Sequence, residues 1–362
     1  MRPAGITAAL GAVLLLVAAG FDAEPLFVGG AAFLLLGAFS AAWVVVGAAG
    51  IGAERSVGAR TVVEGTAVDV RVKVTAGHVG RLPTGVVDDE LLAEPAPLRF
   101  GAPATALRIR AIFDRRGRRI LGPTRVVVRD PAGLAERVVE AGDPVEVLVL
   151  PRISPVTAPG GEGEPGTVGS RAGRPQVAAE VELDGLRPLR PGAPASRIHW
   201  SAWARTGELL ERRLRADADS RALVVLDPRG ADTHEDLDAA VRAAGSLCQH
   251  LARQGGCAVL LPGDRRPSSL DPSLAGWGRL HVRLALVTGD QSPSVAGLAG
   301  RRGPVIYVAA KATARPPRAL AHAVGGGRVL VVPGTIPGRR PAFAVAGCTG
   351  YALRESSVKE AA

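Results

Sequence analysis

Two long apolar runs open the chain and constrain its fold more than any other feature. The first covers about residues 4–20 and the second about residues 26–53, and neither contains a charged residue. A helix needs about 20 apolar residues to cross a bilayer. Only "FDAEP", residues 21–25, separates the runs, which predicts a transmembrane helical hairpin over residues 1–53. A cleavable signal peptide is not expected, because a second and longer apolar run follows the first almost at once.

The charges around this hairpin predict its orientation. Asp22 and Glu24 lie in the turn, whereas Arg2 precedes the hairpin and Arg55 and Arg60 follow it. Because positively charged flanks stay in the cytoplasm, we expect a two-pass protein of the cytoplasmic membrane. Its N-terminus and its soluble domains would then be cytoplasmic. Small residues in the second run would let the two helices pack closely: Gly29, Gly30, Ala31, Ala32, Gly37, Ala41 and Ala42.

Composition limits the partners and the compartment. The formal net charge of +10 favours anionic partners. The arginines are nevertheless dispersed among acidic residues, which is typical of a solvated surface and predicts no specific nucleic-acid site. Cys248, Cys257 and Cys348 are an odd number of cysteines without C-x-x-C spacing. They predict reduced core thiols and a reducing compartment, not a disulfide framework or a zinc site.

Residues 54–153 have the pattern of short β-strands. "TVVEGTAVDVRVKV" alternates apolar and polar residues, and "ALRIRAIFD", "RVVVRD" and "ERVVEAGDPVEVLVL" follow it, bounded by Gly, Pro or Asp. Strands of this length and spacing predict an all-β, sandwich-like domain. A stretch rich in Gly and Pro then predicts a linker over residues 154–183.

Strand-like and helix-like segments alternate from residue 221 to residue 362. "ALVVLD", "CAVLL", "PVIYVAA" and "RVLVVPG" read as buried parallel strands. Three helix-like segments are expected between them: two helices that each have one apolar face, and then "RALAHAV". The apolar positions of these helices are Leu237, Ala240, Ala244, Leu247, Cys248 and Leu251 in the first and Trp277, Leu280 and Leu284 in the second. This alternation predicts a doubly wound α/β domain, in which ligands bind at the carboxyl ends of the strands.

Asp227 ends the first of these strands and is a candidate metal ligand. A divalent cation needs several oxygen ligands, and a von Willebrand factor A-type domain supplies them from D-x-S-x-S at this position. The sequence here is D-P-R-G-A over residues 227–231, so both hydroxyl groups are absent. Arg229 would repel Mg²⁺ and could pair with Asp227 instead. We therefore expect no bound metal and no other cofactor.

Other catalytic patterns are missing from the sequence. It contains no G-x-S-x-G elbow, no P-loop and no G-x-G-x-x-G after a strand, and its six histidines show no H-E-x-x-H spacing. We therefore expect a protein that is not an enzyme. A catalytic Cys–His pair assembled from distant residues stays open as an alternative.

The stretch "RPGAPASRIHWSAWARTGELLERRL" lies within a junction over residues 184–220 and allows two interpretations. In one, Arg197, His199 and Arg205 form a groove for an acidic group of a partner. In the other, Trp200 and Trp203 bury their rings against the sheet, and the arginines bind nearby carboxylates or carbonyl groups. We favour packing, because a single His beside a Trp is more often a packing residue than a catalyst.

Three stretches together resemble the domain-of-unknown-function family fifty-eight, bacterial membrane proteins with a von Willebrand factor A-like domain. "RRGRRILGPTRVVVRDPAGL" is similar to the family's R-R-G, L-G-P and D-P-F-G-L pattern, with Ala132 where the family has Phe. "EVLVLPRI" resembles its V-x-V-Y-P-R-V strand. The junction matches the family's R-x-Y-x-P-G-D and R-x-I-H-W signature but has Leu189 for Tyr and Ala193-Pro194 for an acidic pair. The matching residues are Arg187, Pro191, Gly192, Arg197, Ile198, His199, Trp200, Ala204, Arg205, Gly207 and Leu209.

The resemblance implies a membrane-anchored, non-enzymatic interaction or assembly protein. Its α/β domain would dock a cytoplasmic MoxR-type AAA+ ATPase or an envelope-associated partner. Two alternatives remain, a hydrolase-type enzyme that uses His199 and a non-specific binder of anionic lipid or nucleic acid. The candidate signature and partner-binding residues are Arg187, Gly192, Arg197, His199, Trp200, Arg205 and Asp227.

Overall fold

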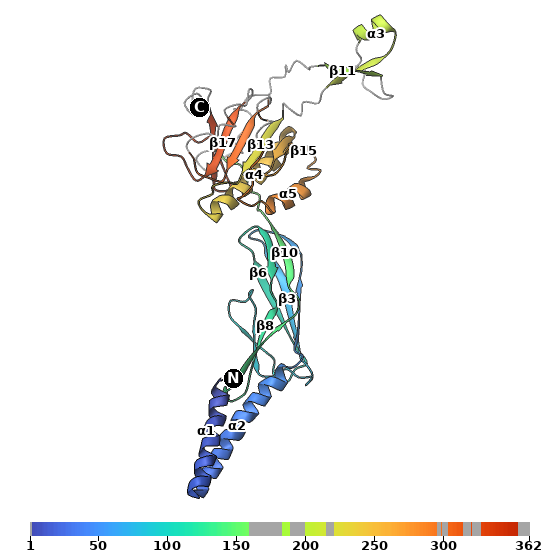
Figure 1. Ribbon diagram of the computed structural model, residues 1–362. Coiled ribbons are helices and arrows are strands. Elements are labelled where there is room, and N and C mark those ends of the chain that lie inside the picture. The colour runs from blue at the N-terminus through green and yellow to red at the C-terminus, as the bar shows by residue number, and fades with distance from the viewer. Residues whose placement is uncertain are drawn as a thin grey trace. The chain divides into compact units, whose positions relative to one another are not determined.

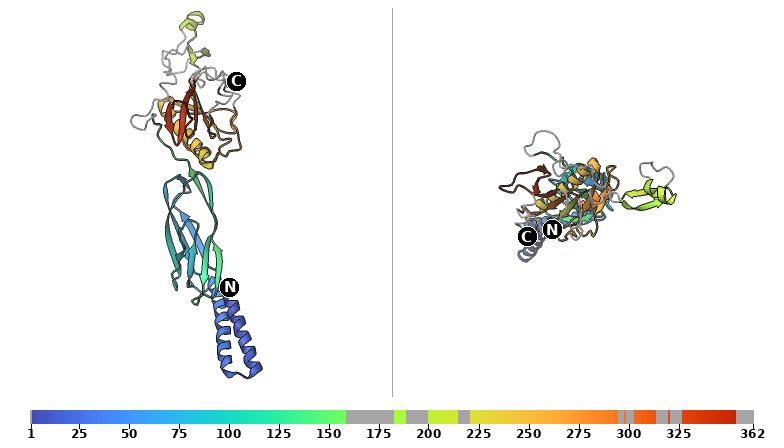
Figure 2. Two further views of the ribbon diagram at one scale, coloured as in Figure 1. Left: turned by 90° about the vertical axis from the view of Figure 1, so that its left-hand side faces the viewer. Right: turned by 90° about the horizontal axis from the view of Figure 1, so that it is seen from above.

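The two apolar runs form a helical hairpin in the computed structural model of the chain, α1 (Arg2–Phe21) and α2 (Glu24–Ala48) (Figure 1; Figure 2). Both helices are long and apolar enough to span a membrane. The second run is not helical to its end, because Gly52 and Ala53 already belong to strand β1.

Glycines let the two helices approach closely. A Cβ atom on Gly11 would clash with the backbone nitrogen of Leu34, and one on Gly37 would lie 2.6 Å from the carbonyl oxygen of Ala4. Neither position therefore tolerates a side chain. Of the small residues expected at the contact, Gly30 and Gly37 lie there, whereas a Cβ on Gly29 would have no neighbour within 4 Å.

The structure describes two compact units, Met1–Val149 and Leu150–Ala362, each treated by itself. The described residues are 2–158, 183–188, 200–214, 221–294, 298, 303–313, 320 and 327–353.

The first unit continues from the hairpin into three small sheets. They have the strand orders β1-β3-β6, β2-β10-β7 and β5-β4-β8-β9. The strands are β1 (Gly52–Val57), β2 (Thr61–Val63), β3 (Ala67–Thr75), β4 (Gly85–Asp88), β5 (Ala96–Pro97), β6 (Ala104–Ile112), β7 (Gly117–Leu121), β8 (Thr124–Arg129), β9 (Glu136–Ala141) and β10 (Val145–Leu150).

Alternating side chains build one apolar core from these sheets. Along β3 the valines at positions 68, 70, 72 and 74 are buried, while the charged residues between them face outward. The predicted alternation is therefore confirmed in β3. The stretch expected as one strand is split in two, because the chain turns at Gly65, whose φ of +75° suits glycine.

Arg55 takes part in this core instead of flanking the membrane as a free charge. Its Nη2 donates to Asp89 Oδ2 at 2.5 Å and its Nη1 donates to the Gly122 carbonyl at 2.6 Å. The side chains of Arg55 and Asp89 are only 3% and 0% exposed. The predicted orientation therefore rests on the remaining flanking charges, not on Arg55.

The second unit contains a seven-stranded sheet in the order β15-β14-β13-β16-β17-β19-β18. The four strands from β14 to β17 in this order are parallel, as the sequence predicts. The other three pair antiparallel, which the sequence did not indicate. The strands are β13 (Ala222–Asp227), β14 (Cys257–Leu260), β15 (Ser268–Leu270), β16 (Val305–Ala309), β17 (Arg328–Pro333), β18 (Phe343–Val345) and β19 (Cys348–Leu353).

Helix α4 (His234–Gly255) packs on one face of this sheet and contacts α5 (Trp277–Ala285) (Figure 1). Both predicted apolar helix faces are confirmed, since their residues lie buried or partly buried in the same cluster. A second apolar cluster lies on the opposite face and includes Leu298 and Leu320. All three cysteines are buried and free, as expected.

Residues 154–158, expected to begin the linker, instead pack on the second unit. The Ser154 backbone N–H donates to Ser246 Oγ at 3.0 Å, and Thr157 forms a β-bridge with Ala344. Val156 is only 3% exposed. Val156 belongs to the same apolar cluster as α4, whose residues 238–248 are all buried.

Candidate functional site

Strand β13 carries Asp227 to the carboxyl edge of the parallel strands. The strand is buried from Leu223 onward, and Asp227 is 9% exposed. The chain then turns at Gly230, with φ of +68°, and enters α4 at Thr233. Thr233 and Asp236 form a capping box, in which each side chain accepts a hydrogen bond from the other residue's backbone N–H. Loop and helix start are therefore held in one conformation.

Both oxygens of Asp227 are engaged. Arg229 donates from Nε to Oδ1 at 2.9 Å and from Nη2 to Oδ2 at 3.0 Å, which is a bidentate pair. The Arg229 backbone N–H also donates to Oδ1, at 3.2 Å. Tyr307, from the neighbouring strand β16, donates its hydroxyl to Oδ2 at 2.6 Å. The pairing of Arg229 with Asp227 that the sequence suggested is confirmed.

Opposing effects set the protonation of these groups. Burial raises the pKa of Asp227, but hydrogen bonds from Arg229 and Tyr307, together with the guanidinium charge, leave that pKa below its ordinary value. Burial and the hydrogen bond to Asp227 raise the pKa of Tyr307. The pKa of Arg229 is raised by its hydrogen bonds to the carboxylate. At neutral pH the site is therefore an ionised carboxylate held by a guanidinium and a neutral phenol.

This donor set does not fit a divalent cation. A metal ion at Asp227 would have to displace Arg229, and the two hydroxyl groups of the D-x-S-x-S pattern are absent. Within the part of the chain that the structure describes, no group of three or more His, Cys, Asp or Glu side chains is placed to hold a metal. The absence of a cofactor stays a prediction.

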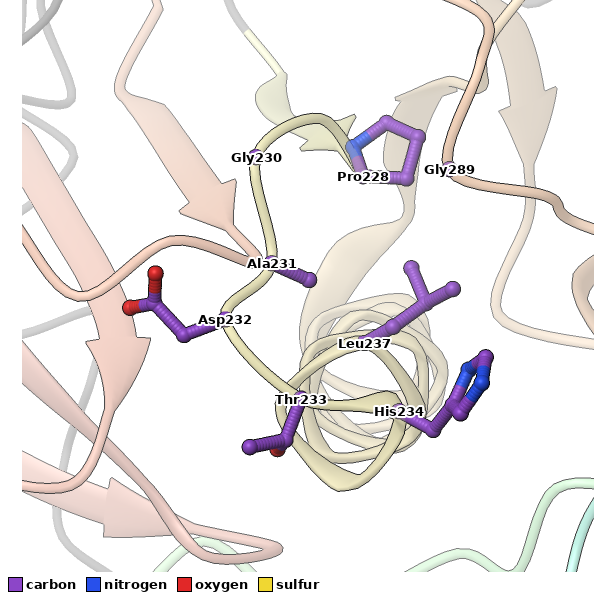
Figure 3. Close-up of a pocket in the computed structure, with 8 residues that line it drawn as sticks. All are labelled: Pro228, Gly230, Ala231, Asp232, Thr233, His234, Leu237 and Gly289. Carbon is purple, nitrogen blue, oxygen red and sulfur yellow. The ribbon is translucent and has the colours of Figure 1, made fainter.

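A hollow of about 490 Å³ lies beside this strand end (Figure 3). Pro228, Ala231 and Leu237 supply apolar surface, His234 stands at the rim, and Asp232 points to the other side of the loop. Gly230, Thr233 and Gly289 complete the lining. The hollow is thus mainly apolar, and Arg229 lies in the same loop, between the lining residues Pro228 and Gly230.

The junction residues are only partly described. Arg187 lies in β11 (Leu183–Pro188), opposite Glu211 of β12 (Leu210–Leu214), while Trp200 and Arg205 lie in α3 (Trp200–Thr206). Gly192, Arg197 and His199 fall outside the described residues.

The two tryptophans of the junction do not match the expected packing role. Trp200 and Trp203 are 54% and 47% exposed, so neither ring is buried against the sheet. They contact each other instead, edge to face, with ring centroids 6.1 Å apart. The two residues are three positions apart in α3, which places their rings on the same face of this helix.

Sequence reasoning missed Tyr307 as a member of the site. Its signal was a phenol within the otherwise aliphatic run "PVIYVAA", because a buried Tyr hydroxyl needs a hydrogen-bond partner. The identity of that partner required the pairing of β16 with β13, which places Tyr307 opposite Val225 and near Asp227.

Comparison with protein-family models and with curated proteins finds no match for this chain. The resemblance to the domain-of-unknown-function family fifty-eight therefore stays a prediction, and the function is argued from the site.

Proposed function

We propose that the chain is a membrane-anchored, non-enzymatic interaction protein whose α/β unit docks an acidic segment of a partner at the Asp227 strand end. In this proposal the first unit contains a β-sandwich and the second is a doubly wound, von Willebrand factor A-like domain. The family resemblance supports a MoxR-type AAA+ ATPase as the partner. Both units would lie on the cytoplasmic side of the membrane.

The fixed guanidinium of Arg229 carries this proposal. Its Nε–Nη2 edge is bound to Asp227, while the other edge, Nη1 with the second N–H of Nη2, is not used by that carboxylate. The Arg229 side chain is 54% exposed. A cation held in this way loses little conformational freedom on binding, so it can donate two hydrogen bonds to a partner's carboxylate. Arg229 would supply the positive charge that a metal ion supplies in domains with the D-x-S-x-S pattern.

The surroundings of Arg229 favour an acidic ligand with an apolar neighbour. Lys311 is exposed and adjoins the loop, since its Cδ lies 3.3 Å from where a Cβ of Gly230 would be. Among the nearby acids, Asp236 caps α4, Glu235 pairs with Arg242, and Asp232 points to the other side of the loop (Figure 3). The hollow beside the loop can accept one apolar side chain. A Glu or Asp next to a Leu or Val therefore matches this surface.

Charge reversal at Arg229 tests the proposal. The full chain, with a photo-crosslinking amino acid at the exposed position 234, is crosslinked in membranes, extracted in mild detergent and analysed by mass spectrometry. Arg229→Glu is compared with Arg283→Glu. Arg283 is a matched control, because it lies on α5 of the same unit, is 43% exposed and pairs with Asp264.

The proposal expects the wild type and Arg283→Glu to crosslink the same AAA+ ATPase, and Arg229→Glu to lose at least about 90% of that product. An ATPase captured equally by all three proteins would overturn the docking role of Arg229. A wild type that captures neither an ATPase nor another defined partner would overturn the interaction function itself.

A further inference from the structure

The corner between β8 and β9 in the first unit contacts the membrane hairpin. Ser40 of α2 donates its hydroxyl to Asp130 Oδ2 at 2.9 Å, and the backbone N–H of Ala4 in α1 donates to the Leu134 carbonyl at 2.8 Å. Burial raises the pKa of Asp130, but hydrogen bonds from Ala135, Ser40 and Ala132 outweigh it and lower the pKa. The corner is therefore held rigidly beside both helices.

A second loop meets α2 near its carboxyl end. Phe100, between β5 and β6, stacks on Trp43 of α2 with ring centroids 6.4 Å apart, and Trp43 contacts Phe39 at 5.7 Å. The three rings form a continuous row from the membrane helix to the β-rich part. The backbone N–H of His78 also donates to the Ala49 carbonyl, just after α2.

Three loop tips near α2 are apolar and exposed: the β8–β9 corner, the loop of Phe100, and the loop of His78 and Val79 between β3 and β4. Exposed arginines lie near these tips in the sequence. Phe100 is 66% exposed and Val79 is 54% exposed, although both lie in a unit with a large buried core. The exposed tip of the corner, residues 131–133, has the uncharged sequence Pro-Ala-Gly. Arg81 lies two residues after Val79, Arg99 precedes Phe100, and Arg137 lies four residues after Gly133; all three arginines are exposed.

The position of Trp43 along α2 sets the depth of these loops. Trp43 lies 19 residues beyond Glu24, the first residue of α2, which is about 29 Å along the helix axis. The hydrocarbon core of a bilayer is about 30 Å thick. If the acidic turn lies at the far headgroups, Trp43 and Phe100 lie at the near interface, where tryptophans concentrate. Ser40, about 5 Å deeper, brings the Asp130 corner to the same interface.

We propose that Phe100, Val79 and the tip at residues 131–133 insert into the lipid headgroup region, while Arg81, Arg99 and Arg137 contact lipid phosphates. We expect this surface to bind a bilayer, because its loops contact α2, the helix that would cross the membrane. This inference rests on the proposed membrane anchoring, and it adds that the β-rich part lies directly on the lipid surface.

Fluorescent probes at single cysteines test the insertion. Phe100→Cys and Ala132→Cys are labelled with an environment-sensitive fluorophore in the full chain, reconstituted into phosphatidylcholine–phosphatidylglycerol vesicles that contain spin-labelled quencher lipids. The native thiols are 0–1% exposed, and unmodified wild type supplies the labelling background.

Two further probes are matched controls. Phe33→Cys lies inside α2 and reports the membrane span itself. Ile112→Cys is 57% exposed at the far end of β6, about 26 Å from the Phe100 loop at the rise of a strand.

The inference expects shallow quenchers to reduce the fluorescence of the probes at positions 100 and 132 at least twofold, deep quenchers to affect position 33, and no change at position 112. Quenching of the probe at position 33, together with unquenched fluorescence typical of an aqueous environment at positions 100 and 132, would overturn lipid insertion and leave the anchor intact. Failure at position 33 as well would overturn the proposed membrane anchoring, and the insertion with it.

Discussion

Replacing Tyr307 by Phe tests how firmly the carboxylate of Asp227 is held. The hydroxyl of Tyr307 donates to Asp227 Oδ2 at 2.6 Å, and Tyr307 is 1% exposed, so water cannot replace the lost donor. A buried hydrogen bond to a charged group contributes about 2 kcal/mol. The change should therefore raise the opening equilibrium of the surrounding strands roughly thirtyfold.

Hydrogen exchange followed by mass spectrometry measures this opening in the detergent-solubilised chain, since peptides from β13 and β16 report the site directly. The decisive comparison repeats Tyr307→Phe in an Asp227→Asn background. Without the negative charge the hydrogen bond should contribute only about 1 kcal/mol, so the effect on exchange should fall to roughly fivefold.

Tyr351→Phe is the matched control. Tyr351 is equally buried, and its hydroxyl accepts a hydrogen bond from the Ile336 backbone N–H at 2.6 Å, so the same substitution removes a bond to a neutral group. The effect of Tyr351→Phe on hydrogen exchange should not change in the Asp227→Asn background. If Tyr307→Phe costs the same in both backgrounds, Asp227 is not held by a charge-assisted hydrogen bond and the described site is incorrect.

Two further predictions concern buried groups away from the site. Arg55→Met leaves the carboxylate of Asp89 buried and unpaired, and should lower the free energy of unfolding of the first unit by about 3–5 kcal/mol; a loss below about 1 kcal/mol in a denaturant titration would contradict the buried pair. Burial lowers the pKa of His281 below its ordinary value of 6.5, despite its hydrogen bond to the Pro151 carbonyl. The unfolded state therefore takes up a proton first, and stability of the second unit should fall as the pH drops from 6.5 towards the lowered pKa. His281→Gln should flatten this slope, and an unchanged slope would show that another group causes it.

Local patterns were enough to predict the elements that depend on near neighbours. Uncharged runs of helical length predict the hairpin, because the cost of placing charges in lipid acts on each residue separately. Alternation predicts β3, and a 3.6-residue period predicts the buried faces of α4 and α5, because each element has one geometry and one core to face. The position of Asp227 at the end of an apolar strand could likewise be predicted from its near neighbours in the sequence.

Interactions between distant segments could not be predicted in this way. Arg55 looked like a membrane-flanking charge until its partner Asp89, 34 residues later, buried it. Residues 154–158 looked like a linker because Gly and Pro mark flexibility, but α4 offers them an apolar surface. Two tryptophans close together predict a buried core position, but Trp200 and Trp203 contact each other and stay exposed.

The order of residues along the chain was enough to predict the hairpin, the strand and helix periods, and an aspartate without the hydroxyl groups of a metal site. What Asp227 binds depends on the fold, because Tyr307 lies 80 residues away and reaches it through the parallel pairing of β13 with β16. The same holds for Phe100 and Trp43, whose contact joins a loop to helix α2. Periodicity records which face of an element is buried, whereas a functional site depends on which faces meet.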